Sequence, residues 1–118
     1  MKFVSVKSKS IKDDINLISQ FFDCSYGRYG LMYKLFISAQ NDLKSKVVYC
    51  LDKNQVIGWG LRYKDVNHHE VMLYVDKDYR RKGIGTKIYN KLVIGLSKDR
   101  ISNSAHNVSA RKFFNSVK

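Results

Sequence analysis

The 118-residue chain contains no proline, only two cysteines and few acidic residues, and its apolar residues never form a long uninterrupted run. Cys24 and Cys50 are too few for a disulfide framework. The three histidines do not supply the short spacings of a four-ligand zinc site. A membrane-spanning helix needs about 18 consecutive apolar residues. We therefore expect two reduced thiols, no bound metal and no membrane segment.

The missing proline, together with frequent lysine, asparagine, isoleucine and tyrosine, is typical of an AT-rich genome. Between Lys2 and Lys7 the only apolar residues are Phe3, Val4 and Val6, which excludes a secretory signal. The hydrophobic fraction of 44% is enough to bury one core. We expect a single cytoplasmic domain over residues 1–118.

Positive charge is abundant where negative charge is scarce. There are 22 Lys and Arg residues against 10 Asp and Glu residues, which gives a net charge of +12. Such a chain attracts polyanions, which include nucleotide cofactors, nucleic acids and acidic protein surfaces. The densest cluster runs from Lys77 to Lys82, with Lys87 further on. A nucleic-acid binder often combines a basic stripe with interleaved aromatic residues, and no such motif is indicated here.

The hydrophobic pattern predicts a mixed α/β fold. The expected strands are residues 2–6, 46–51, 56–63, 69–75 and 101–105. Helices are expected after an N-cap at Ser10, from Leu31, over residues 84–96 and after an N-cap at Asn107. The element order is therefore β-α-α-β-β-β-α-β-α. The strands before and after the third helix should be parallel neighbours joined by a crossover.

Local spacing adds detail to two of these elements. The first helix is expected to bury one face, made of Ile11, Ile15, Ile18 and Phe22. Residues 52–55 join two strand-like runs and predict a hairpin. Gly58 and Gly60, inside the second of those strands, indicate a bulge or a close approach of another part of the chain.

Residues 75–86 carry the strongest chemical signal, since they end a strand, form a glycine-rich turn and open a helix. A helix start offers unpaired N–H groups and the positive end of its dipole. Gly83 and Gly85 let a phosphate approach those N–H groups, and the basic residues before them add positive charge. The P-loop pattern is absent, and Ile88 stands where a dinucleotide-binding loop needs its third glycine.

This run resembles the signature of the GNAT family of N-acetyltransferases, Val-x-Pro-x-Tyr-Arg-Gly-Lys-Gly-Ile-Gly, and departs from it only at Lys77 and Arg81. A second segment, from Asn107 to Phe114, resembles the family's Asn-x-x-Ala-x-x-Phe-Tyr. Both motifs occur in the expected order, so the resemblance spans nearly the whole chain. It implies the GNAT acyl-CoA N-acyltransferase fold, N-acetyltransferase activity and acetyl-CoA as cosubstrate.

The resemblance also implies which residues hold acetyl-CoA. Backbone groups of Leu73 and Val75 would pair with the pantetheine arm as an added strand does, and N–H groups of the turn would bind the pyrophosphate. Asn107 would lie near the pantetheine. Phe114 stands where the family commonly has a tyrosine that protonates the departing thiolate. The expected cofactor-binding residues are Leu73, Val75, Arg80, Arg81, Lys82, Gly83, Ile84, Gly85, Thr86, Asn107 and Phe114.

Acetyl transfer needs the acceptor amine in its neutral form, so a base that removes its proton is expected. The family often places this base on the central strand, where Glu70 is the first catalytic candidate and His69 or His68 the next. The alternative is that residues 67–70 form only a polar hairpin rim. His106 is a further candidate for a catalytic role and is otherwise a surface residue.

The acceptor side is expected between the first two helices. Tyr26, Arg28 and Tyr29 lie there and are the expected substrate-binding residues, with an ordinary surface loop as the alternative. Trp59 is expected in the core or in a pocket wall. Family members usually continue past the last helix with one or two more strands. Without them a sheet edge is exposed, so we expect a homodimer, or an open site that suits a protein acceptor.

The leading functional interpretation is direct transfer of an acetyl group from acetyl-CoA to an amine of a protein. One alternative is a catalytically weak acyl-CoA-binding or interaction module, which Phe114 favours. Another is a basic nucleic-acid-binding or ribosome-associated protein, whose affinity would fall steeply with salt.

Overall fold

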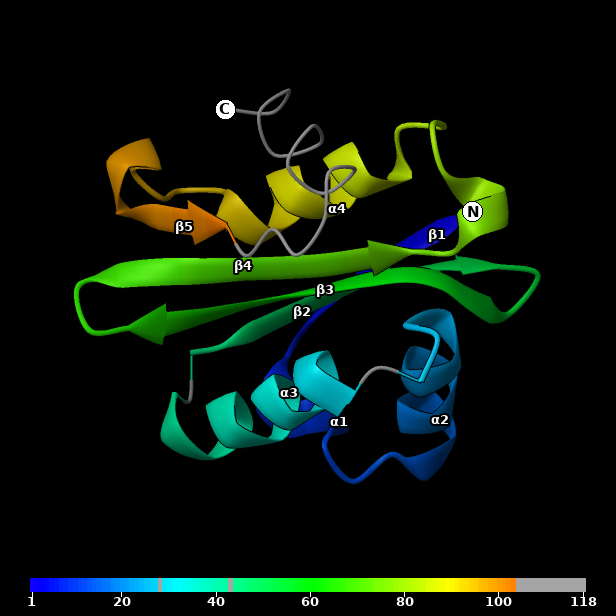
Figure 1. The fold of residues 1–118 in the computed structure, drawn as a ribbon, viewed down its shortest axis with the longest axis horizontal. Helices are drawn as coiled ribbons and strands as arrows, with labels where there is room; N and C mark the ends of the chain where they lie inside the picture. The colour runs from blue at the N-terminus through cyan, green and yellow to red at the C-terminus, as the bar shows by residue number, and fades with distance from the viewer. Residues whose placement is uncertain (28, 43, 104–118) are drawn as a thin grey trace.

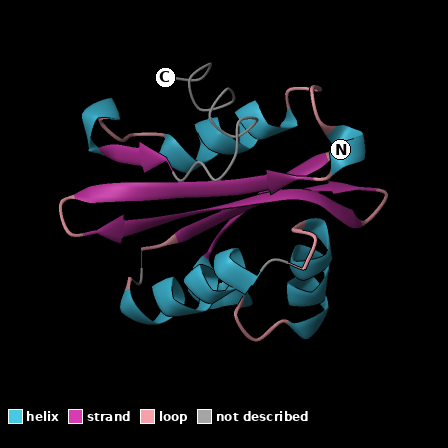
Figure 2. Cartoon of the chain, viewed as in Figure 1, coloured by secondary structure: helices cyan, strands magenta, loops and turns pink. Residues whose placement is uncertain are grey.

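The strands of the computed structural model form one sheet with helices on both of its faces (Figure 1, Figure 2), and residues 1–27, 29–42 and 44–103 are described. The elements are β1 (Lys2–Lys7), α1 (Ser8–Ile11), α2 (Ile15–Cys24), α3 (Tyr29–Asn41), β2 (Lys46–Asp52), β3 (Gln55–Asp65), β4 (His68–Val75), the 3-10 turn η1 (Lys77–Tyr79), α4 (Ile84–Val93), the 3-10 turn η2 (Lys98–Arg100) and β5 (Ile101–Asn103). The mixed α/β class expected from the sequence is confirmed.

The sheet has the strand order β1-β2-β3-β4-β5. The first four strands are antiparallel neighbours, and β5 runs parallel to β4 after the crossover through α4. The expected parallel pair on either side of that helix is therefore confirmed. Helices α1, α2 and α3 cover one face of the sheet and α4 lies on the other (Figure 1).

The hairpin expected at residues 52–55 is present and has a two-residue turn. Lys53 and Asn54 have φ angles of 52° and 64°, as a type I′ turn requires at both central positions. The turn sets the register of β2 against β3, with a bulge between Cys50 and Leu51.

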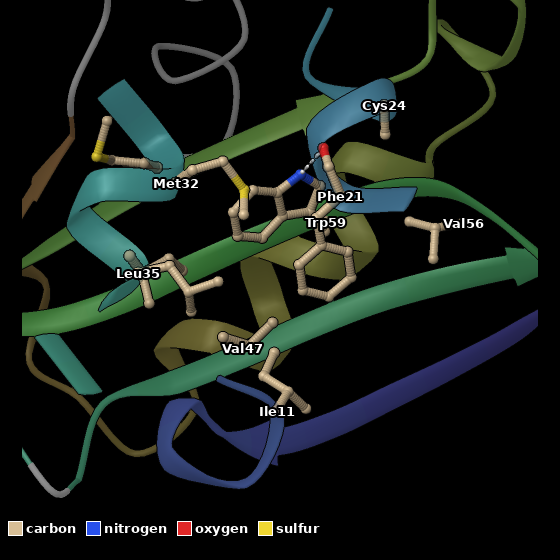
Figure 3. Close-up of a cluster of buried hydrophobic side chains, with 10 residues drawn as sticks. Ile11, Phe21, Cys24, Met32, Leu35, Val47, Val56 and Trp59 are labelled. Carbon is tan, nitrogen blue, oxygen red and sulfur yellow. Dashed lines mark hydrogen bonds between the residues drawn. The ribbon is translucent and has the colours of Figure 1, made fainter. Parts of the chain in front are cut away.

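Each face of the sheet has its own buried cluster. On the α1–α3 face it comprises Ile11, Phe21, Cys24, Met32, Leu35, Val47, Val56, Trp59, Leu61 and Met72 (Figure 3). On the α4 face it comprises Val48, Cys50, Ile57, Val71, Val75, Ile84, Ile88, Tyr89 and Leu92. Side chains of a strand alternate between the two faces, so neighbouring residues of β4 serve different halves of the molecule.

Trp59 lies at the centre of the α1–α3 cluster and is fully buried. Its ring stacks on Phe21 with a centroid distance of 4.4 Å. The indole Nε1–H donates to Phe21 O at 3.1 Å, the dashed bond of Figure 3, and to Ser25 Oγ at 2.8 Å. A buried indole needs such a partner, and here it joins β3 to the end of α2. Trp59 is thus a core residue.

The close approach expected at the β3 glycines is also confirmed. A Cβ at Gly60 would lie 2.8 Å from Leu92 Cδ1 and 2.9 Å from Leu73 Cβ. At Gly58 it would lie 3.2 Å from Ile88 Cδ1. These two glycines let α4 sit directly on the sheet, which positions the beginning of α4 next to the end of β4.

The start of the first helical region differs from the prediction. A short helix, α1, follows β1 directly, and α2 begins only after Asp14, whose side chain accepts a hydrogen bond from Leu17 N–H. The N-cap expected at Ser10 was therefore wrong. Ile15, expected on the buried face, is 79% exposed, while Phe21 is fully buried.

The final helix expected after Asn107 lies outside the described residues. Within the described part of the chain, both cysteines are buried and unpaired, and no cluster of His, Cys, Asp or Glu could hold a metal ion. A search of the same residues for a helix that is long and apolar enough to span a membrane finds none.

Candidate functional site

The end of β4 has backbone groups that no described strand uses. Among the described residues, β5 pairs with β4 over residues 69–71, and no described strand pairs with this edge of β4 after Val71. Asp76 N–H donates to Ile57 O at 2.7 Å, so even-numbered residues of β4 direct their backbone groups toward β3. Alternate residues use the same edge of a strand. Leu73 and Val75 therefore direct their N–H and C=O groups to the edge that no described strand pairs with.

The first turn of α4 has no side-chain cap among the described residues. Gly83 is at the N-cap position with φ at 79°. The first backbone bond into the helix joins Lys87 N–H to Gly83 O at 3.1 Å, so the N–H groups of residues 84–86 have no acceptor within the helix. A Cβ at Gly83 would meet no atom within 4 Å. The turn therefore presents open N–H donors at the positive end of the helix dipole.

The side chains around this turn differ in their exposure to solvent. Arg80, Arg81, Lys82 and Thr86 are exposed, whereas the Ile84 side chain is buried and belongs to the core. Of Ile84 only the backbone N–H is available to a ligand. Gly85 follows in the first turn of α4. Seven of the predicted cofactor-binding residues thus follow one another in residues 80–86, which we call the donor loop.

The segment before the donor loop is fastened to the sheet. Tyr79 Oη donates to Asp52 Oδ2 at 2.8 Å, and this hydrogen bond to a carboxylate raises the pKa of Tyr79. Asp76 accepts from Asp78 N–H and caps η1. Arg80 Nε donates to Val75 O at 3.0 Å, which ties the loop to the end of β4.

Tyr26, expected as an acceptor-pocket residue, contacts the donor side. Its hydroxyl accepts a hydrogen bond from Lys77 N–H, and its ring lies below the guanidinium of Arg80, at 5.8 Å from ring centroid to Cζ. The backbone of Tyr26 has a φ of 58°, a strained value for a bulky residue. Of the other two candidates, Arg28 lies outside the described residues and Tyr29 opens α3.

The candidate bases lie on opposite faces of the sheet. Glu70 alternates with Met72 and so points to the α1–α3 face, where its Oε1 lies 3.1 Å from His68 Nε2. His69 alternates with Val71 and points to the α4 face. The structure therefore brings Glu70 and His68 together but separates both from His69. Glu70 precedes by one residue the last β4–β5 pair among the described residues, Val71 with Asn103.

His69 has an environment that disfavours its charged form. Burial is the main cause that lowers its pKa, and the positive charges of Arg62 and Lys64 lower it further, while Asp42 acts in the opposite direction. Its Nδ1 is buried without a hydrogen-bond partner among the described residues. His69 is thus neutral at physiological pH, on the face that α4 covers.

A groove that the sequence did not reveal lies between α2 and α3. Its volume is about 350 Å³, and it is lined by Ile18, Ser19, Phe22, Asp23, Met32 and Phe36. The helical spacing of its apolar residues is that of a core face, so no sequence signal separated the groove lining from the core. Asn107, Phe114 and His106, which the sequence analysis singled out, lie outside the described residues.

Comparison with known proteins agrees with this arrangement. A model described as the acetyltransferase (GNAT) family matches residues 15–117, whereas a sequence search of curated proteins returns no match. An aminoglycoside acetyltransferase from an uncultured soil metagenomic sample, in complex with trehalose, has a TM-score of 0.65 at 18% identity and covers 99% of this chain and 86% of its own.

Two further solved structures share the fold. A ribosomal-protein-alanine N-acetyltransferase from Brucella melitensis biovar Abortus 2308 has a TM-score of 0.59 at 14% identity and covers 98% of this chain and 89% of its own. An aminoglycoside N-acetyltransferase in complex with CoA has a TM-score of 0.64 at 9% identity and covers 99% of this chain and 90% of its own.

Proposed function

The chain belongs to the acetyltransferase (GNAT) family, and on that premise we propose that it transfers the acetyl group of acetyl-CoA directly to an amine of a protein. The family's cosubstrate is acetyl-CoA, which supplies an acetyl thioester as the activated donor. The proposal rests above all on one observation: the first turn of α4, which no described side chain caps, follows the end of β4 at an edge that no described strand uses.

The described residues fit the two polar parts of the donor. A pyrophosphate matches a helix start whose N–H groups lack acceptors, and a Cβ would occupy the open space that Gly83 leaves. Arg81 and Lys82 are exposed and add positive charge. The amide groups of a pantetheine arm match the backbone N–H and C=O groups of Leu73 and the N–H of Val75, as in strand addition, while Val75 O already accepts from Arg80 Nε.

Glu70 is the proposed general base. Its carboxylate is positioned by His68, and Glu70 precedes on β4 the residues Leu73 and Val75, along whose edge the thioester arm is proposed to lie. The carboxylate would take a proton from the acceptor ammonium, since only a neutral amine attacks an acyl carbon. His69 points to the other face and is not proposed as the base.

The acceptor is proposed to be a protein because the molecule is poorly suited to a polycationic small molecule. A net charge of +12 repels such a compound, and Asp23 is the sole acidic residue among the described residues that line the α2–α3 groove. The groove is otherwise mostly apolar and could take an aliphatic or aromatic side chain of a peptide.

Gly83→Glu tests the donor site. The change places a carboxylate where the pyrophosphate would bind and forces a side chain into φ 79°. Calorimetric titration should show acetyl-CoA affinity weakened by about tenfold or more, a change of roughly 1.4 kcal/mol or more. Gly95→Glu is the matched control, since Gly95 has φ at 80° and equally open surroundings after the other end of α4. Equal losses in both variants, or no binding by the wild type, would contradict the donor site.

Thiol release tests the acceptor. The wild type should release CoA with peptides that carry a free amine and much more slowly with an aminoglycoside of equal concentration. Glu70→Gln should lower kcat and leave acetyl-CoA affinity unchanged. Faster release with the aminoglycoside would overturn the protein acceptor. Acetyl-CoA binding without release for any amine would instead identify the catalytically weak binding module.

A further inference from the structure

We propose that the chain carries a second anion-binding surface, at the C-terminal end of α4, which binds the phosphate backbone of a nucleic acid. The surface is made of Lys7, Lys46, Arg62, Lys64 and Lys91, which we call the basic face. It does not rest on the proposed acetyl transfer, and it lies away from the donor loop.

Strand register places three of these cations side by side. Lys7 pairs with Lys46 across β1 and β2, and Lys46 pairs with Arg62 across β2 and β3. Directly opposed residues share a face of the sheet, and neighbouring strands are about 4.8 Å apart. The row therefore spans about 10 Å. Like charges placed directly opposite one another are destabilising.

The end of α4 holds two members of the row in place. Arg62 Nη1 donates to Leu92 O at 2.8 Å, and Lys46 Nζ donates to Lys91 O. Carbonyl groups at a helix C-terminus favour nearby cations, so the helix compensates part of the repulsion. Lys7, Lys64 and Lys91 are exposed, and none of their side chains makes a hydrogen bond to a described residue.

Little negative charge is available to the basic face. Besides burial, Arg62 and Lys91 lower the pKa of Lys46. Burial lowers the pKa values of Arg62 and His69, and Asp42 is the single described carboxylate that raises them. Both of its oxygens already accept backbone N–H groups, from Lys44 and Lys64. An added anion would therefore relieve the part of the repulsion that the end of α4 and Asp42 do not compensate.

The chemistry of the surface favours phosphates over an acidic protein. Protein–protein interfaces are depleted in lysine, and their strongest contacts come from buried aromatic and arginine anchors. Here four of the five cations are lysines, and the exposed aromatic side chains of the described residues, Tyr26, Tyr33 and Phe36, belong to the α2–α3 side. Lysine contacts to phosphates carry no sequence information, so binding without sequence preference is expected.

The basic face and the donor loop can be occupied together. α4 has 10 residues and is therefore about 15 Å long. The donor loop lies at its N-terminal end, whereas Leu92 and Lys91, which accept from the basic face, lie at its C-terminal end. A nucleic acid on the basic face should thus leave the donor loop open.

The test is fluorescence anisotropy of a fluorescein-labelled 20-base-pair DNA duplex of mixed sequence, titrated with the full chain between 50 and 200 mM KCl (roughly the range over which phosphate contacts are screened). The triple variant Lys7→Gln, Lys64→Gln, Lys91→Gln removes the exposed cations of the basic face. The control Lys2→Gln, Lys9→Gln, Lys34→Gln removes as much charge from exposed lysines on the α1–α3 side. Circular dichroism checks that both variants are folded.

For the wild type and the control, a plot of the logarithm of the affinity against the logarithm of the salt concentration should be linear with a negative slope. For the basic-face variant the magnitude of that slope should be smaller by roughly 2–3. Saturating acetyl-CoA should leave the DNA affinity unchanged. The proposal is overturned by absent binding at 50 mM KCl (about the lowest salt used), by equal losses in the two triple variants, or by displacement with acetyl-CoA. Poly-glutamate that competes as well as unlabelled DNA per charge would assign the surface to an acidic protein and overturn it too.

Discussion

The guanidinium carbon of Arg80 lies 5.8 Å from the centroid of the Tyr26 ring. Tyr26 belongs to the connection between α2 and α3, whereas Arg80 opens the donor loop. The same tyrosine hydroxyl accepts the N–H of Lys77, and Arg80 Nε donates to Val75 O. The connection between the first two long helices is thus joined to the donor loop and to the edge of β4 through these two side chains.

This contact should make Tyr26 a positioning residue for the donor loop. Tyr26→Phe removes the acceptor for Lys77 N–H but keeps the ring below Arg80, whereas Tyr26→Leu removes both. An exposed cation–π contact is worth about 0.5–1 kcal/mol, so the KM for acetyl-CoA should rise roughly two- to fivefold from Phe to Leu at unchanged kcat. Steady-state kinetics with a fixed amine acceptor measures it. Equal KM values for the two variants would show that the ring contact has no effect on the loop.

Gly60→Ala should destabilise the fold. The new methyl would lie 2.8 Å from Leu92 Cδ1 and 2.9 Å from Leu73 Cβ, and overpacking of this kind costs about 1–3 kcal/mol. Urea denaturation measures the free energy of unfolding. Gly30→Ala is the control, because Gly30 lies in α3 with no atom within 4 Å of a Cβ, and alanine there should stabilise by up to about 1 kcal/mol. A neutral Gly60→Ala would mean that α4 can move away from the sheet at little cost.

The lowered pKa of His69 predicts a loss of stability in mild acid. Its folded-state pKa lies below the ordinary 6.5 because of burial and then of Arg62 and Lys64. In the window just below pH 6.5 the unfolded chain binds more protons, so the free energy of unfolding decreases as the pH falls. Urea denaturation from pH 7.5 to 5 (roughly the range of histidine titration) should show a smaller decrease for His69→Gln than for the wild type. His68→Gln keeps His69 and should retain that decrease.

Both thiols should be unreactive in the folded protein. Burial, and secondarily the charge of Asp76, raises the pKa of Cys24 to about 12, and burial also raises the pKa of Cys50. Because the thiolate is the reactive species, a disulfide reagent should label neither cysteine at neutral pH and both after unfolding. Ser10→Cys, at an exposed position, supplies a reactive reference thiol. Rapid labelling of one native cysteine would contradict the buried position of that residue.

The parts of the site with local signals could be predicted from the sequence. Gly83 lies at a positive φ that few other residues adopt, and a glycine before a helical pattern announces such a turn. Gly60 was informative for a different reason, since a missing side chain within an apolar strand indicates close packing. Both signals depend on the residue itself and its immediate neighbours.

Long-range contacts explain the expectations that failed. Ser10 and Asp14 are both good N-cap residues, and the difference is made by the packing of α1, where Ser8 N–H donates to Ser45 O. The role of Tyr26 was predicted from the position of its loop between two helices, whereas its contacts Lys77 and Arg80 are far away in the sequence. The alternation of side chains along β4 places Glu70 and His69 on opposite faces of the sheet. It does not tell which face receives the acceptor, because helices cover both faces.

Trp59 is the single tryptophan of the chain, and its indole joins β3 to the last turn of α2. The protein therefore has one intrinsic tryptophan fluorophore, which is stacked on Phe21 and buried away from solvent. Its emission reports on the contact between α2 and the sheet. A red shift that precedes the global loss of circular dichroism would therefore mark α2 as the first element to detach, without any label attached to the chain.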